Sequence, residues 1–128
     1  MEEHRYFRAL LPCSAEVAAW IEAWLLTEYP DDLESLEAID VQTYATRAGL
    51  VFGCEDFGLI EPVAEAVQAA QRHFAGDPEA CPPLWGFEYA DTGYRGYDDF
   101  GGGAVLVTPV EIVYFDTYQW LREKGVIQ

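Results

Sequence analysis

The chain has 128 residues, of which 51% are apolar and 15% aromatic, and it carries 23 carboxylates against seven lysines and arginines. This length predicts one domain spanning 1–128, with a core large enough to fold without a disulfide or metal staple. The aromatic content argues against intrinsic disorder. A formal net charge of −16 argues against direct binding to nucleic acid or anionic lipid and favours a basic protein partner. High charge also keeps a small protein soluble, and that alternative needs no partner.

The sequence offers no sign of secretion or membrane insertion. Its apolar runs are shorter than a membrane span, and residues 1–4 lack the basic character of a signal peptide. Cys13, Cys54 and Cys81 are odd in number and far apart. They therefore predict reduced thiols and a cytoplasmic protein.

The chain opens with a predicted strand and helix. Residues 4–11 have strand character, Pro12 ends them, and Ser14 is a good N-cap for the helix that follows. One apolar stripe defines this helix: Val17, Trp20, Ile21, Trp24 and Leu25. Leu26 lies opposite the stripe, which leaves open a second covered surface or a partner. The predicted partners also include a second copy of the chain, as a homodimer.

A predicted hairpin follows the first helix. Pro30 ends the helix, because the residue before a proline avoids helical geometry. The connection at 31–40 is strongly acidic, within a stretch that contains no lysine or arginine between Arg8 and Arg47. Beyond it, residues 41–46 and 50–54 have strand character and are joined by a turn.

The second predicted helix begins near Glu61, with Pro62 suited to its first turn, and Gly76 is its natural stop. Its buried side comprises Ile60, Val63, Ala64, Val67 and Phe74. Residues 84–89 then alternate as a half-buried strand, and a long loop with five of the eleven glycines is expected from Asp91 to Gly103.

The last part of the chain predicts two more strands and a short helix. Residues 104–108 and 112–115 are β-branched and aromatic runs, and Thr108–Glu111 is interpreted as a tight turn between them. Asp116 or Thr117 is expected to cap the final helix. The predicted fold is α+β: an antiparallel sheet with a ferredoxin-like βαββαβ core, extended by a C-terminal β-hairpin and a short helix. Both long helices would cover one face of the sheet and leave the other for solvent, further elements or a partner.

The predicted glycine loop allows three interpretations. Gly101–Gly103 could turn amides toward a phosphate, but Asp98 and Asp99 precede them and a strand follows where a helix should. A bulge or a close backbone approach at a strand start fits better. In the third interpretation, a small ligand binds under the 93–103 loop, with pocket walls from Trp85, Tyr89 and Tyr114.

Catalytic and metal sites have little support, and no cofactor is expected. Ser14 and Ser35 are the only serines, and neither lies in a Gly-x-Ser-x-Gly elbow. His73, Asp77 and Cys81 have helical spacing, but glycine and proline interrupt that stretch. Tyr94-Arg95-Gly96-Tyr97 instead has the composition of a contact surface, unless Arg95 folds back onto Asp91 or Asp98.

Three segments of the last third, Trp85-Gly86-Phe87-Glu88-Tyr89, Phe100-Gly101-Gly102-Gly103-Ala104-Val105 and Gln119-Trp120-Leu121, resemble small uncharacterised proteins of bacteriophages and mobile elements. The resemblance covers about a third of the chain and carries no catalytic residues. It implies a setting in which compact acidic proteins block host defence enzymes or mimic nucleic acid. Immunity proteins that neutralise basic toxins are similar in size and charge.

The sequence therefore predicts a non-enzymatic acidic inhibitor that covers a basic, nucleic-acid-binding surface of another protein. The small-ligand binding module is the alternative. The predicted partner-binding residues are Asp31, Asp32, Glu34, Glu37, Asp40, Tyr94, Arg95, Tyr97, Asp98 and Asp99. Clustering of carboxylates on one face would favour the inhibitor, whereas an even scatter would favour plain solubility.

Overall fold

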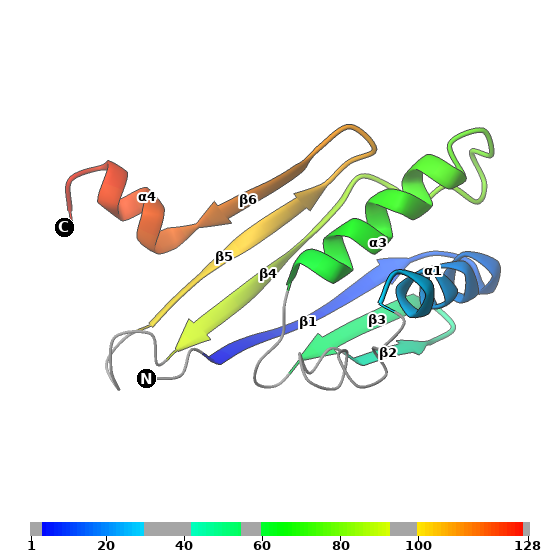
Figure 1. Cartoon of the computed structure of the whole chain (residues 1–128), viewed down its shortest axis with the longest axis horizontal. Helices are drawn as coiled ribbons and strands as arrows, with labels where there is room; N and C mark the ends of the chain where they lie inside the picture. The colour runs from blue at the N-terminus through cyan, green and yellow to red at the C-terminus, as the bar shows by residue number, and fades with distance from the viewer. Residues whose placement is uncertain (1–3, 30–41, 55–59, 93–99, 127–128) are drawn as a thin grey trace.

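A computed structural model describes residues 4–29, 42–54, 60–92 and 100–126. Over these residues the protein is α+β, with three helices and one six-stranded antiparallel sheet in the order β2-β3-β1-β4-β5-β6. The strands are β1 (His4–Pro12), β2 (Gln42–Ala45), β3 (Gly49–Cys54), β4 (Trp85–Thr92), β5 (Phe100–Val107) and β6 (Ile112–Asp116). The helices are α1 (Ala15–Glu28), α3 (Ile60–His73) and α4 (Thr117–Glu123). Figure 1 shows α1 and α3 over the same side of the sheet.

The predicted elements of the first two thirds are confirmed to within a few residues. Ser14 caps α1, its hydroxyl oxygen accepting a hydrogen bond from the amide of Val17 at 3.3 Å. The turn between β2 and β3 closes through paired bonds between Thr46 and Gly49, and Gly49 has a φ of 149°. A side chain there would also collide with the carbonyl of Leu11, so only glycine fits. None of the described helices is long and apolar enough to cross a membrane.

Alternation along the strands sorts side chains to two faces. The face toward α1 and α3 receives Phe7, Ala9, Leu11, Leu50, Phe52, Trp85, Phe87, Tyr89, Val105 and Val107, all buried. Against them pack helix residues such as Val17, Ile21, Val63 and Val67, each fully buried. The apolar stripes predicted for both helices are therefore confirmed, with Trp20 and Trp24 half-buried at the edge of this core.

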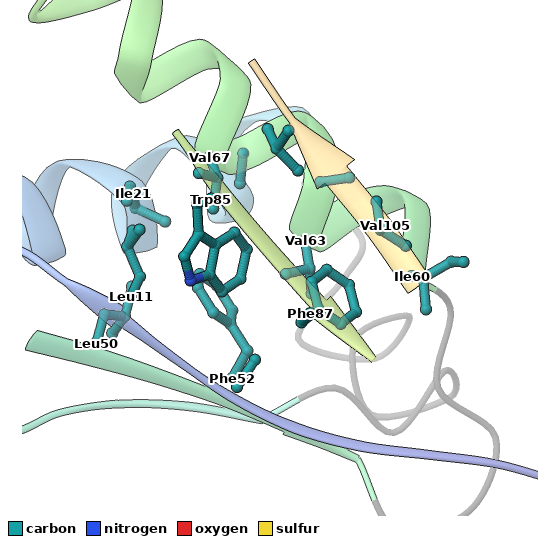
Figure 2. Packing of buried hydrophobic residues seen from close by; sticks show 14 of the residues in the cluster. Leu11, Ile21, Leu50, Phe52, Ile60, Val63, Val67, Trp85, Phe87 and Val105 are labelled. Atoms are coloured by element: carbon teal, nitrogen blue, oxygen red, sulfur yellow. The ribbon is translucent and has the colours of Figure 1, made fainter. Parts of the chain in front are cut away.

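The sheet has two halves that meet along a short seam. β1 and β4 pair only through His4–Tyr6 and Ala90–Thr92, and Figure 1 shows the two strands fanning apart beyond that point. Trp85 occupies the widening: its indole N–H donates to the carbonyl of Leu10 at 3.0 Å. Figure 2 shows the indole next to Phe52, and the two ring centroids are 5.8 Å apart. One buried aromatic side chain thus joins the halves where backbone pairing stops.

The glycine-rich segment differs from its prediction. Asp91 and Thr92 belong to β4, and Gly101–Gly103 lie inside β5, so a loop spanning 91–103 was wrong. Gly103 pairs with Tyr89 on one side and Asp116 on the other. A side chain at Gly103 would strike the Phe115 carbonyl and the Tyr89 ring. The predicted close backbone approach is therefore confirmed. The Gly102 amide donates to the Thr117 hydroxyl at 3.2 Å, so it is already engaged and does not face a phosphate site.

The predicted turn and cap near the C-terminus are confirmed. The amide of Thr108 donates to the carbonyl of Glu111 at 2.9 Å, and the Thr108 hydroxyl accepts from the amides of Val110 and Glu111. Asp116 caps α4 by accepting from the amide of Gln119 at 3.0 Å. Short-range hydrogen bonds thus close the turn that the sequence predicts.

Side chains of α3 fasten the helix to the far half of the sheet. Gln71 is buried and donates through Nε2 to the carbonyls of Val107 at 3.0 Å and Pro83 at 2.8 Å. Gln68 and Arg72 donate to the carbonyls of Thr108 and Pro109. The Oε1 atom of Gln71 is buried without a hydrogen-bond partner among the described residues. These contacts fix α3 over β5 and leave its outer side to the solvent.

Candidate interaction surfaces

The ten predicted partner-binding residues lie within 31–40 and 94–99, outside the described residues. Two other surfaces of the described chain stand out, on opposite sides of the sheet. One is acidic and formed by the long helices, and the other is apolar and formed by the uncovered strands.

The first surface, here called the acidic helix layer, consists of α1, α3 and the turns at 74–81. Its carboxylates are Glu16, Glu22, Glu28, Glu61, Glu65, Asp77 and Glu79. All except the half-exposed Glu22 are exposed. Seven carboxylates thus face a single arginine, Arg72, whose Nε donates to the carbonyl of Pro109 at 2.6 Å. The layer carries a concentrated negative charge.

Contacts within the layer leave that charge largely unneutralised. Glu65 accepts a hydrogen bond from the Tyr29 hydroxyl at 3.1 Å, which is a neutral donor. Glu61 and Glu65 stand four residues apart on α3, where like charges repel. Burial raises the pKa of Tyr114, and these two glutamates raise it further. None of the layer's carboxylates forms an ion pair with another described residue. The Arg5–Asp91 pair, at 2.8 Å, lies within the β1–β4 seam and outside the layer.

The second surface, here called the open face, is the side of the sheet away from α1 and α3. Its exposed apolar side chains are Tyr6, Leu10, Tyr44, Leu106, Val113 and Phe115, each 39–45% exposed. Trp120 of α4 adds to it, with its ring centroid 6.4 Å from that of Phe115. Among the described side chains that point outward from the strands, the charged ones are Arg8 of β1 and Glu88 of β4. The open face is therefore apolar and close to neutral.

The sequence contained a signal for this surface that was not used to assign a site. Residues 104–107 and 112–115 are continuous apolar runs, which are typical of strands buried on both faces. In each run, every second residue points toward the helices, and the residues between them point to the open face. Leu10, beside the core residue Leu11, follows the same rule. Continuous runs on a sheet with helices on one face alone indicate a second surface that can be covered.

Two adjoining hollows of about 360 and 350 Å³ lie on the open face. Both are lined by Glu88, Ala104 and Phe115, and the second also reaches Gly101–Gly103 and Tyr89. Trp85 and Tyr114, predicted as pocket walls, line neither hollow: Trp85 is buried in the core and Tyr114 points to the helix side. The predicted pocket under the 93–103 loop includes residues outside the described ranges, so the small-ligand module stays a prediction. The hollows hold few of the converging polar groups that orient a small ligand.

The three cysteine side chains are free thiols in buried or partly buried positions. Burial raises the pKa of the Cys13 thiol, against a hydrogen bond from Leu50 that lowers it. The Cys54 thiol donates to the carbonyl of Arg5 at 3.3 Å, and the Cys81 thiol to the carbonyl of Gln71 at 3.5 Å. A protonated thiol is a poor nucleophile. Among the described residues, no group of three or more histidine, cysteine, aspartate or glutamate side chains is arranged to hold a metal ion.

Comparison with models of protein families, with curated proteins and with solved structures found no significant match to this chain. The suggested likeness to bacteriophage and mobile-element proteins therefore stays a prediction. Function has to be argued from the surfaces themselves, since a fold class alone does not specify activity.

Proposed function

We propose that this protein is a non-enzymatic acidic inhibitor that covers a basic, nucleic-acid-binding surface of a partner protein. The observation that carries the proposal is the uneven placement of charge. Seven carboxylates and one arginine lie in the acidic helix layer, while the outward strand positions of the opposite face hold Arg8 and Glu88. Solubility alone needs no such asymmetry, whereas docking onto a basic surface requires it.

The acidic helix layer suits such a role physically. Helices fixed by a packed core hold the backbone positions of their glutamates constant, so binding orders side chains without also ordering the helix backbone. A layer with few compensating cations attracts a basic partner and speeds the encounter. Phage anti-defence proteins and toxin immunity proteins are the setting we propose for this activity. The acidic residues at 31–40 and 98–99 lie outside the described residues and contribute to the net negative charge of the chain.

A displacement experiment tests this function. Nucleic-acid-binding proteins from an extract of the source cells are retained on immobilised double-stranded DNA, and the purified protein is added at 150 mM salt. We expect it to release a defined basic protein and to form a complex with that protein whose affinity falls steeply as salt rises. Release of nothing, or a complex insensitive to salt, would contradict the proposal.

Two variants with equal net charge separate a specific surface from bulk charge. Glu28→Lys/Glu65→Lys alters the acidic helix layer, and Glu111→Lys/Glu123→Lys alters exposed positions outside it. The first should lose most of the displacing activity and the second should keep it. Equal losses would show that total charge matters and that this layer is not the site.

For the fold, we propose that the first six elements form a ferredoxin-like unit, to which β5, β6 and α4 are appended. Supporting this are the element order β1-α1-β2-β3-α3-β4 and the antiparallel neighbours β2-β3-β1-β4. The short β1–β4 seam is the place where this unit departs from a regular sheet.

A further inference from the structure

We infer that the open face is a homodimer interface, in which two copies of this chain pack sheet against sheet around a two-fold axis that runs along the β1–β4 seam. This inference does not depend on the function proposed for the acidic helix layer. It rests on three features of the open face: its area, its charge and the order of side-chain sizes on β1 and β4.

The apolar area is of the order that a stable dimer uses. Four aromatic side chains (Tyr6, Tyr44, Phe115 and Trp120) and three aliphatic ones (Leu10, Leu106 and Val113) are each 39–46% exposed. Because an aromatic side chain covers about 150–250 Å², together they present on the order of 500 Å². That reaches the upper range of patches on monomers, about 300–600 Å². A standard interface buries roughly 800 Å² from each partner, so the remainder has to come from the strand backbone and the other outward residues between these side chains.

The charge on this face favours a second copy over other occupants. Two chains of net charge −16 repel each other through most surfaces, and the open face is where the repulsion is weakest. Arg8 and Glu88 lie two residues beyond the paired Tyr6 and Ala90 on neighbouring strands. A two-fold axis between β1 and β4 puts Arg8 of each copy over Glu88 of the other. The Arg8 guanidinium, which contacts the ring and hydroxyl of Tyr44 within the single chain, then turns from Tyr44 to Glu88 on association. An isologous interface uses every such pair twice.

Side-chain size is complementary along the same axis. The outward residues of β1 are large (Tyr6, Arg8, Leu10). The corresponding residues of β4 are Ala90, which pairs with Tyr6, and Glu88 and Gly86, which lie where the two strands diverge. When β1 of one copy lies over β4 of the other, Tyr6 faces Ala90 and Leu10 faces the space above Gly86. Stacked sheets lie about 10 Å apart, which requires large residues opposite small ones.

The same two-fold axis also aligns the outer strands of the two copies. The axis brings β3 over β5 and β2 over β6 of the second copy. Val51 lies in the same row as Tyr44 and Leu10 and is already buried between its neighbours in the single chain; this row then lies over Leu106. Tyr44 in turn faces Val113. The dimer has four layers, with the sheets inside and both acidic helix layers outside, so one dimer presents two acidic surfaces.

Sedimentation equilibrium on the full chain from 1 to 200 µM tests the inference. We expect twice the chain mass, with dimerisation that strengthens as salt screens the two negative charges. Leu106→Glu should weaken dimerisation by about a hundredfold, because it buries an unpaired charge. The matched control Val110→Glu, at a position 85% exposed in the β5–β6 turn, should leave it unchanged. A wild-type protein that stays monomeric to 200 µM would overturn the inference.

A charge exchange tests the axis itself. Arg8→Glu and Glu88→Arg should each be monomeric, since each places like charges opposite each other twice. Mixing the two variants should restore a dimer of one copy of each, because every opposed pair is again of opposite sign. Circular dichroism confirms that both variants are folded. Homodimers that persist in both variants, and that Val113→Pro abolishes, would indicate pairing through the β6 edge and overturn the inference. Failure of the mixed dimer to form would overturn it as well.

Discussion

The two faces of the sheet are built from the same strands but are exposed to different surroundings. On the helix side, aromatic and branched side chains from β1, β3, β4 and β5 are buried against α1 and α3. On the open face, similar side chains such as Leu106 and Phe115 stay more than two-fifths exposed. The acidic residues of the described helices add a further contrast, because they surround the covered side and leave the uncovered side nearly neutral.

This difference shows how period-two alternation divides roles within one strand. Trp85, Phe87 and Tyr89 are buried, while Gly86, Glu88 and Ala90 between them form the open face. Stability is therefore expected to depend on the first set and association on the second. The substitutions below test that division, from the largest expected effect to the smallest.

Trp85→Ala should cause the largest loss of stability. It removes a buried indole that packs on Phe52 and donates to the Leu10 carbonyl across the widened seam. Truncating a buried aromatic of this size costs about 3–5 kcal/mol of unfolding free energy, measured by urea denaturation. Trp120→Ala, at a position 46% exposed, is the matched control and should cost about 1 kcal/mol or less in the monomer. Equal losses would show that the two aromatics do not have distinct roles.

Gln71→Ala should cost less, about 2 kcal/mol, because it leaves the carbonyls of Val107 and Pro83 without their donor in the interior. Gln68→Ala, which removes one partly buried bond to Thr108, should cost about 1 kcal/mol or less. Hydrogen exchange should show the β5–β6 half loosening more than the β1–β3 half in the Gln71 variant. An equal increase of hydrogen exchange in both halves would contradict a local role of Gln71 in holding α3 against β5.

The sequence predicted which helices and strands form better than it predicted where they begin and end or what their side chains contact. Local signals fixed α1 through Ser14 and α4 through Asp116, since caps depend on neighbouring residues alone. The glycines of β5 were misassigned because turn propensity is local, whereas strand pairing with β4 and β6 is set by distant residues. Gln71 was not predicted, because a buried glutamine needs acceptors that only the tertiary fold brings near. The predicted acidic site lies outside the described residues. The absence of lysine and arginine between Arg8 and Arg47 indicated an acidic segment, but the packing of α1 beside α3 into one acidic layer required the tertiary fold.

Alkaline pH should destabilise the helix side through its tyrosines. Burial raises the pKa of Tyr89 above its ordinary value of 10.0, with Asp116 adding to the rise and Arg5 opposing it. Burial likewise raises the pKa of Tyr114. The folded state therefore holds these protons more tightly than the unfolded chain does. Their contribution to stability is fully present below about pH 10 and is lost as pH rises through the higher folded-state values.

Urea unfolding between pH 8 and pH 11.5 measures this effect. Tyr89→Phe and Tyr114→Phe should each flatten the fall in stability above pH 10, because the substituted ring has no proton to lose. Together they should flatten it more than either alone. A double variant with the wild-type slope would show that these two phenols do not couple to folding.

The smallest expected effect concerns repulsion inside the acidic helix layer. Glu65 lies one turn from Glu61 on α3, and its carboxylate accepts a hydrogen bond from the Tyr29 hydroxyl. Glu65→Gln removes the repulsion and keeps an acceptor for that hydroxyl, so it should stabilise the fold by about 0.3–0.5 kcal/mol at 10 mM salt. Near 1 M salt, where the Debye length is about 3 Å, the gain should vanish. Glu123→Gln on α4, next to Arg122 and Lys124, is the matched control and should bring no gain at either salt concentration. If both variants stabilised the protein equally, the repulsion would belong to the whole charge of the chain, and the acidic helix layer would lose its standing as a distinct electrostatic surface.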